Sequence, residues 1–145
     1  MIDDIKLESP LPYLHIRPHP HRRLKTASSG RKIPIVNTSL WAAKRLKKHC
    51  KSLYCFPRYT NEERCNLNST SAATNKRIKS IAHKDDVIHA LRHSFSDRLG
   101  SIEAPPDMID QLGGWTLRSI GQGHGDGNSL ELMQSSLEKM VSQKL

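Results

Sequence analysis

The most informative part of the chain is 85-DDVIHALRHSFSDRL-99. Its apolar residues recur three or four positions apart, at Val87, Ile88, Leu91, Phe95 and Leu99. This period predicts an amphipathic helix over about residues 85–99. His89 and Arg92 are three positions apart, so they share a neighbouring face of that helix. An imidazole and a guanidinium placed in this way suit contacts to a phosphodiester.

Glycines and a tryptophan follow this helix. Pro105-Pro106-Asp107 predicts the start of a short helix and Gly113-Gly114 its end, because proline suits the first helical turn and glycine the residue after the last. Trp115 comes next and adds an indole N–H that can donate a hydrogen bond. The glycines of 121–127 interrupt the chain before a last amphipathic helix, over residues 130–140.

The upstream part predicts short strands and then helices. Three partly alternating segments read as a small antiparallel sheet, at 14–17, 22–26 and 32–36. Thr38 is placed to cap a helix over 39–49, whose apolar positions are Leu40, Trp41, Ala43 and Leu46. Residues 51–70 show no sustained period, and Thr70 or Ser71 is expected to cap a second helix. The sequence therefore predicts a mainly helical α+β fold with a small antiparallel three-stranded sheet and about five helices.

Charge is concentrated in the first half of the chain. The net charge is +9, and residues 9–61 hold twelve Lys or Arg and no Asp or Glu, while residues 62–145 hold ten basic and eleven acidic residues. A concentrated positive surface is typical of proteins that bind the phosphate backbone of nucleic acids. A solvated basic face without a specific partner is the alternative. The first interpretation predicts double-stranded DNA as the partner.

Length and composition predict one modest domain. At 145 residues and 36% hydrophobic content the chain can bury a single core, so residues 1–145 are expected to form one domain. No apolar run approaches the roughly 20 residues that cross a bilayer. The first residues lack a basic leader followed by an apolar stretch. We therefore expect a cytoplasmic protein without a membrane partner.

Two sets of residues could be read as metal ligands. His89 and His93 have the i, i+4 spacing of a zinc-binding helix, but Ala90 stands where a metalloprotease motif needs glutamate. His49 could join the three cysteines, whose spacing is irregular: Cys50, Cys55 and Cys65. Free thiols in a reducing compartment fit that spacing better than disulfides. We expect no metal site.

Three separated motifs resemble those of tyrosine recombinases, the phage integrase family. The segment 89-HALRHSF-95 resembles the HxLRHxF box, 112-LGGW-115 resembles the LGH or GW box, and 23-RLKTASSGRKIPI-35 resembles the hairpin that carries the catalytic lysine. The spacing of 23 positions from Arg92 to Trp115, and of nine from there to His124, also agrees with the family. The resemblance covers nearly the whole chain and implies the C-terminal part of a recombinase catalytic domain.

The resemblance implies phosphodiester strand transfer without a metal or nucleotide cofactor. In the family a tyrosine attacks the scissile phosphate, two arginines clamp its oxygens, histidine and tryptophan donate hydrogen bonds, and a lysine protonates the leaving oxygen. Carried onto this chain, Arg92 is the second clamp. His89 and Trp115 are the supporting donors, Lys25 is the acid, and His124 occupies the position of the nucleophile.

Two departures from the family predict that strand exchange by the standard route fails. His124 stands where the family has tyrosine, and the first clamp arginine has no counterpart, because the chain starts too close to the hairpin. An internal start or gene decay would account for that loss. Imidazole can form a covalent phosphoryl intermediate, which would favour nicking over religation, but we interpret His124 as a surface loop residue.

Three interpretations of function follow. The chain is a recombinase catalytic domain completed by upstream sequence, or a non-catalytic remnant that binds DNA, or a protein that docks its C-terminal helix onto a recombinase protomer. The expected DNA contacts are Arg22, Arg23, Lys25, Arg31, Lys32 and Arg92.

Overall fold

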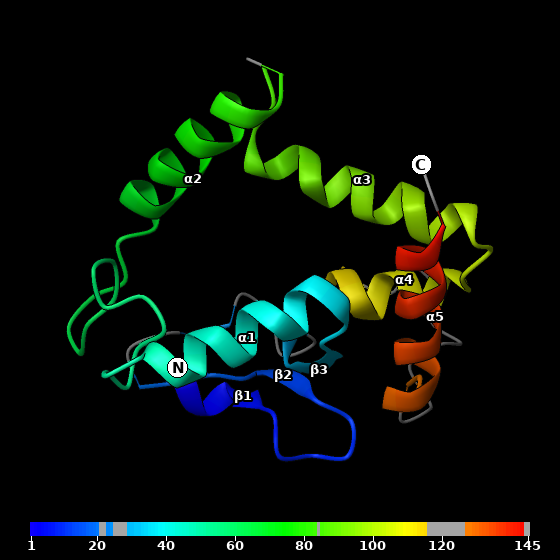
Figure 1. Ribbon diagram of the computed structural model, residues 1–145, viewed down its shortest axis with the longest axis horizontal. Helices are drawn as coiled ribbons and strands as arrows, with labels where there is room; N and C mark the ends of the chain where they lie inside the picture. The colour runs from blue at the N-terminus through cyan, green and yellow to red at the C-terminus, as the bar shows by residue number, and fades with distance from the viewer. Residues whose placement is uncertain (21–22, 25–28, 84, 116–126, 144–145) are drawn as a thin grey trace.

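The computed structural model describes residues 1–20, 23–24, 29–83, 85–115 and 127–143 (Figure 1). Across these residues the chain forms five α-helices, a short 3-10 helix and one three-stranded antiparallel sheet, which confirms the expected mainly helical α+β class. No helix within these ranges is long and apolar enough to cross a membrane. The elements in chain order are η1 (Ile2–Asp4), β1 (Ile5–Lys6), β2 (Tyr13–Ile16), β3 (Arg31–Pro34), α1 (Asn37–His49), α2 (Leu67–Ile81), α3 (Ile88–Ser101), α4 (Pro106–Gly113) and α5 (Leu130–Ser142).

The sheet contains two predicted strands and one that the sequence did not predict. β2 lies in the middle, where Leu14 pairs with Ile5 of β1 and with Ile33 of β3. These strands correspond to the predicted segments 14–17 and 32–36. The prediction for 22–26 was wrong in its described part, since Arg23 and Leu24 lie outside any strand and β1 completes the sheet instead. The two residues of β1 are too few to show an alternating pattern.

The hydrophobic core lies where the last three helices meet the end of β3. Leu99 of α3 and Met108 of α4 are almost fully buried, and the other core residues are Val36, Ile102, Leu112, Met133, Leu137 and Met140. α4 ends where it was predicted to end: Gly114 adopts a left-handed conformation with φ of +66°, and its N–H donates to the Asp110 carbonyl. Glycine adopts this conformation without a steric penalty.

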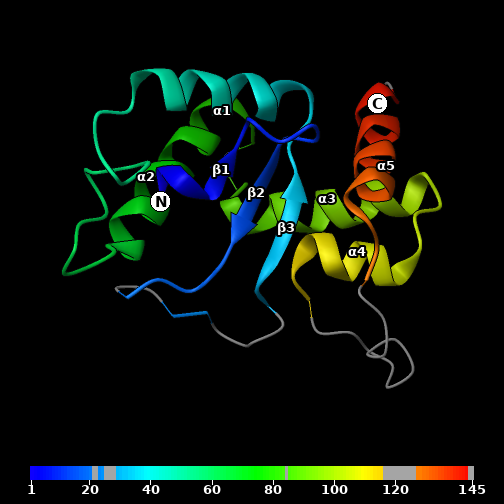
Figure 2. The same ribbon diagram turned by 90° about the horizontal axis from the view of Figure 1, so that it is seen from below.

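The first two helices lie outside this core. On α1 only Ala43 is buried and Trp41 is 62% exposed, although both were predicted as apolar positions of one amphipathic face. α2 buries no residue. Figure 1 shows α2 and the first turns of α3 standing away from the sheet and from α1, which Figure 2 shows beside the strands. The apolar positions of α1 therefore face an incompletely filled space.

The start of α1 differs from the prediction. The helix begins at Asn37, and Thr38 lies within its first turn rather than capping it. Ser39 closes this turn, because its Oγ donates to the Val36 carbonyl at 2.5 Å and accepts from the Val36 N–H at 3.0 Å. Neighbouring hydroxyl and amide side chains offer the same capping chemistry, so the sequence does not distinguish among them.

Asparagine side chains satisfy backbone N–H donors at the starts of α2 and α3. Asn66 caps α2 by accepting from the Ser69 N–H at 3.0 Å, so the predicted caps four and five residues later were wrong. Asn75 lies inside α2, and its Oδ1 accepts from the Ile88 N–H at 2.8 Å. That bond satisfies a free donor at the start of α3, which begins three residues later than predicted.

A buried carboxylate connects the N-terminus to the segment after β2. Asp4 is 3% exposed and accepts from the Met1 ammonium at 2.7 Å and from Arg17 Nε at 2.8 Å, while His19 Nε2 lies 2.7 Å away. Burial alone would raise the pKa of Asp4, but these hydrogen bonds outweigh it and hold the pKa well below its ordinary value. The ionised carboxylate therefore stabilises this end of the sheet.

Candidate phosphate-binding site

Arg92 and Trp115 meet in space, as the motifs predicted. The guanidinium carbon of Arg92 lies 4.6 Å from the centroid of the Trp115 ring, within the range of a cation–π contact. Trp115 directly follows α4, and its backbone N–H donates to the Asp110 carbonyl at 2.9 Å. The end of α4 therefore fixes the indole, and the indole positions an exposed arginine from the middle of α3.

The two glycines before Trp115 leave room for side chains from other segments. A Cβ atom at Gly113 would collide with the Trp115 ring, and one at Gly114 would collide with the guanidinium of Arg31. The Arg31 side chain, from the first residue of β3, therefore lies directly against the backbone at Gly114. This contact brings β3 to the end of α4, next to the stacked Arg92.

The guanidinium of Arg31 has hydrogen-bond partners for only some of its donors in this position. Its Nη1 donates to the Ser29 carbonyl at 2.9 Å, while its buried Nε has no hydrogen-bond partner among the described residues. Burial, and then the charge of Arg92, lower the pKa of the Arg31 guanidinium below its ordinary value. No carboxylate in the described ranges forms an ion pair with either arginine. We call Arg31, Arg92 and Trp115 the arginine cluster.

A second positive feature adjoins the arginine cluster. A hollow of about 750 Å³ is lined by backbone and side chains from the end of β2 to the start of β3, and we call it the basic hollow. Arg31 lines it together with Arg17, Arg23 and Lys32, and no acidic residue lines it among those described. Burial, followed by the charges of Arg17 and Lys32, lowers the pKa of His15, which also lines the hollow. Arg31 thus belongs to both features.

The two histidines of α3 form a pair one helical turn apart. The rings of His89 and His93 are exposed and pack edge to face, with centroids 5.0 Å apart and planes at 80°. His89 therefore lies on the same helix as Arg92, and its recorded ring contact is with His93. Neither histidine joins a group of three or more His, Cys, Asp or Glu residues that could hold a metal ion among the described residues. His49 and the three cysteines likewise form no group among the described residues that could hold a metal ion.

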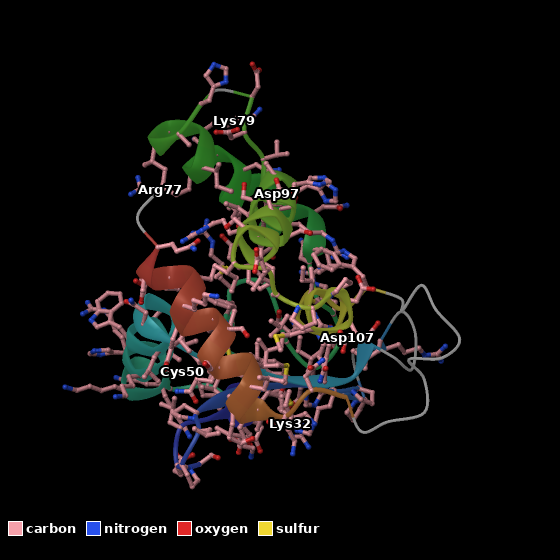
Figure 3. All side chains as sticks on the ribbon, turned by 90° about the vertical axis from the view of Figure 1, so that its right-hand side faces the viewer. Lys32, Cys50, Arg77, Lys79, Asp97 and Asp107 are labelled. Carbon is pink, nitrogen blue, oxygen red and sulfur yellow. The ribbon has the colours of Figure 1, made fainter. Side chains whose placement is uncertain are left out.

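The remaining predicted residues lie at the edge of the cluster or outside the described part. Arg23 and Lys32 are exposed, and Lys32 Nζ lies 5.3 Å from the centroid of the Tyr13 ring. Figure 3 shows Lys32 at the opposite end of the molecule from Arg77 and Lys79 of α2, so those cations belong to another surface. Three expected residues lie outside the described part of the chain: His124, the expected nucleophile, Lys25, the expected acid and a DNA contact, and Arg22, a second expected DNA contact.

Sequence reasoning assigned Arg31 to DNA contacts but not to a place beside Arg92. Strand alternation could have indicated that the Arg31 side chain points toward the core helices. Arg31 and Ile33 occupy the same face of β3, and Ile33 packs against the core. Arg17 was not assigned to the site, whereas His15 was interpreted as a surface residue near DNA. No protein-family model, curated protein or solved structure matches the chain.

Proposed function

We propose that the arginine cluster and the adjoining basic hollow bind the phosphate backbone of double-stranded DNA. The observation that carries this proposal is that two guanidinium groups from different elements lie against adjacent residues at the end of α4, Arg31 against Gly114 and Arg92 over the Trp115 ring. Like charges repel, and no described carboxylate neutralises Arg31 or Arg92. A phosphate that contacts both guanidinium groups offsets that repulsion.

The adjoining hollow favours a phosphate chain over a single anion. Arg31 lies in both features, so a ligand that fills the cluster also lies next to Arg23 and Lys32. Successive phosphates of one strand can use both features together. The net charge of +9 adds a long-range attraction for the same ligand.

We further propose that the chain is related to tyrosine recombinases and does not exchange strands. The three motifs and their spacing support the relationship, and the Arg92–Trp115 contact agrees with the roles that the resemblance implies for these residues. Histidine at the position of the nucleophile argues against strand exchange. DNA binding without catalysis fits both sets of observations.

Salt-dependent binding tests the DNA proposal. Affinity for a 20-base-pair duplex is measured by fluorescence anisotropy at several salt concentrations, because each lost phosphate contact reduces the slope of log K against log salt by about 0.9. We expect Arg31→Ala and Arg92→Ala to weaken binding and to flatten the slope by about that amount each. Arg45→Ala is a matched control, because Arg45 also lies over an indole, 5.6 Å from the Trp41 ring centroid. Equal slopes in all four proteins would contradict the proposal.

Covalent trapping tests the absence of strand exchange. A suicide duplex with a nick beside the cleavage position retains any covalent protein–DNA intermediate for detection on a denaturing gel. We expect no adduct from the wild-type chain. An adduct that disappears in His124→Ala would establish chemistry at that residue and refute the non-catalytic part of the proposal.

Docking of the last helix onto a recombinase protomer is the less favoured function. Met133, Leu137 and Met140 place the apolar face of α5 in the core of this same chain. Only its outer face, where Leu132 is 51% exposed, is free of these contacts. The arginine cluster, in contrast, is open to a ligand on the side where Arg92 is exposed.

A further inference from the structure

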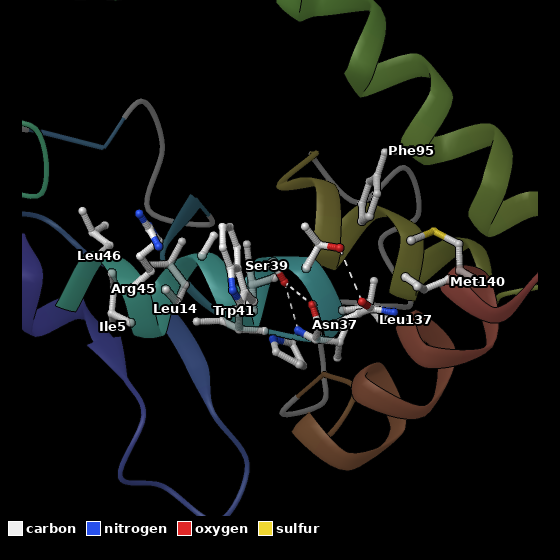
Figure 4. A pocket seen from close by; sticks show the side chains of 18 of the residues that line it. Ile5, Leu14, Asn37, Ser39, Trp41, Arg45, Leu46, Phe95, Leu137 and Met140 are labelled. Carbon is white, nitrogen blue, oxygen red and sulfur yellow. Dashed lines mark hydrogen bonds between the residues drawn. The ribbon is translucent and has the colours of Figure 1, made fainter. Parts of the chain in front are cut away.

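A large apolar trough separates α1 from the core helices (Figure 4). Its walls come from α1, from α3 and α5, and from the end of the sheet, and its apolar lining includes Trp41, Leu46, Phe56, Phe95 and Met140. Figure 4 shows Trp41 and Leu46 on the α1 side and Phe95 and Met140 on the other. We call this feature the apolar trough. None of the three residues of the arginine cluster lines it.

The size of the apolar trough suits a segment of polypeptide. Its volume of about 1120 Å³ exceeds the roughly 300–1,000 Å³ typical of small-molecule pockets. Trp41 is 62% exposed and Phe56 60% exposed. Large aromatic side chains exposed together along a groove indicate a protein interaction site. An amphipathic helix is the segment that commonly fills such a groove, with one apolar stripe facing inward.

The charges around the apolar trough define the partner further. Arg45, His49 and Arg98 line it, and no acidic residue does so among those described. Lys44 and Lys48 are exposed on the same helix as Arg45. A helix that enters the trough therefore lies beside cations, and acidic residues that flank its apolar stripe would pair with them.

No helix in the described part of the chain is of this kind. α1, α2 and the first turns of α3 leave apolar residues outside the core. α1 and α2 contain no aspartate or glutamate, and α3 has Asp97 beside Arg98. α5 carries Glu131 and Glu138, but its apolar face already lies in the core. A second copy would thus bring basic helices to a basic groove. We propose that the apolar trough binds an amphipathic helix of another protein, with Asp and Glu residues flanking its apolar stripe.

Two synthetic peptides test this proposal. Both are 18-residue helices with leucine at i, i+3, i+4 and i+7 spacing, and the remaining positions are mainly glutamate in one and lysine in the other. The full chain carries Trp115→Phe, so that Trp41 is its only tryptophan. We expect the glutamate peptide to produce a saturable change in Trp41 fluorescence and the lysine peptide to produce none.

Charge reversal supplies the matched control. Arg45→Glu should weaken binding of the glutamate peptide by about tenfold and allow the lysine peptide to bind. Lys79→Glu changes the net charge equally, but it lies on α2 at the far end of the molecule (Figure 3) and should leave both results unchanged. The proposal is overturned if both peptides bind equally well or if neither binds. It is also overturned if Arg45→Glu and Lys79→Glu lose the same amount of affinity for the glutamate peptide. Sedimentation without peptide should give a monomer, and a concentration-dependent dimer lost in Trp41→Ala would assign the apolar trough to a second copy instead.

Discussion

Replacing Gly114 with alanine should displace Arg31 from the arginine cluster and lower the free energy of unfolding. The two effects can be measured separately. Gly114 has a φ of +66°, and a Cβ added there would overlap the Arg31 guanidinium. The left-handed conformation costs alanine about 1–2 kcal/mol. Displacing the guanidinium also breaks its hydrogen bond to Ser29, which is worth about 0.5–1.5 kcal/mol. Together these contributions give an expected loss of about 1.5–3.5 kcal/mol in the free energy of unfolding.

Two other glycines separate these contributions. Gly127 also has a positive φ, of +74°, but a Cβ there would lie 3.0 Å from Gln111 Nε2 rather than on Arg31. Gly127→Ala should therefore show the conformational cost of about 1–2 kcal/mol without a loss of DNA affinity. Gly100 lies in α3 with nothing near its Cβ position, so Gly100→Ala should stabilise the protein by about 0.5–1 kcal/mol.

Urea unfolding and duplex binding are measured on the same preparations, so that the loss of stability and the loss of DNA affinity can be compared for each variant. Gly114→Ala should reduce DNA affinity and the salt slope as much as Arg31→Ala does. The double variant Arg31→Ala with Gly114→Ala should lose no more affinity than either single variant, because both act through one guanidinium. If Gly114→Ala matched Gly127→Ala in stability and bound DNA like the wild type, the placement of Arg31 against Gly114 would be refuted.

Three further predictions concern stability. Leu99→Ala should cost about 2–5 kcal/mol in urea unfolding because Leu99 is fully buried, whereas Leu91→Ala, at 57% exposure, should change stability by less than about 0.5 kcal/mol; similar losses would contradict the core assignment. Asp4→Asn should cost roughly 1.5–3 kcal/mol at pH 7. Since the folded pKa of Asp4 is depressed, its stabilisation is fully present above the ordinary pKa of 3.8 and is lost as pH falls through the folded value, so the two unfolding curves should converge in acid. Asn66→Ala should remove the cap of α2 at a cost of about 1 kcal/mol, seen as reduced helicity by circular dichroism, and unchanged helicity would show that the cap is dispensable.

Helices with a clear apolar period could be predicted from the sequence. α3, α4 and α5 were located within a few residues, because each buries one face in a shared core. The end of α4 also carries a local signal, the glycine at 114. β1 could not be predicted, since a two-residue strand is defined by its partner. The exposed position of Trp41 was equally unpredictable, because an apolar period shows that a face exists and does not show what covers it.

The candidate site was predictable where motif spacing brings helix residues together. Arg92 and Trp115 were paired by their positions in two boxes, and they do lie in contact. Arg31 was expected only as one of several cations, because its place beside Gly114 depends on how β3 packs against the end of α4. That packing arises between segments more than 80 positions apart, and no local pattern encodes it.

Helix α3 connects the core to the arginine cluster. Leu99 anchors its second half, and Arg92 lies seven residues earlier on its exposed half, which corresponds to about 10 Å along the helix axis. A tilt of about 10° around the anchor would therefore shift Arg92 by about 2 Å, which is enough to break a guanidinium–phosphate hydrogen bond. Under the proposed function, substitutions in the core can thus weaken DNA binding while every side chain of the arginine cluster is unaltered.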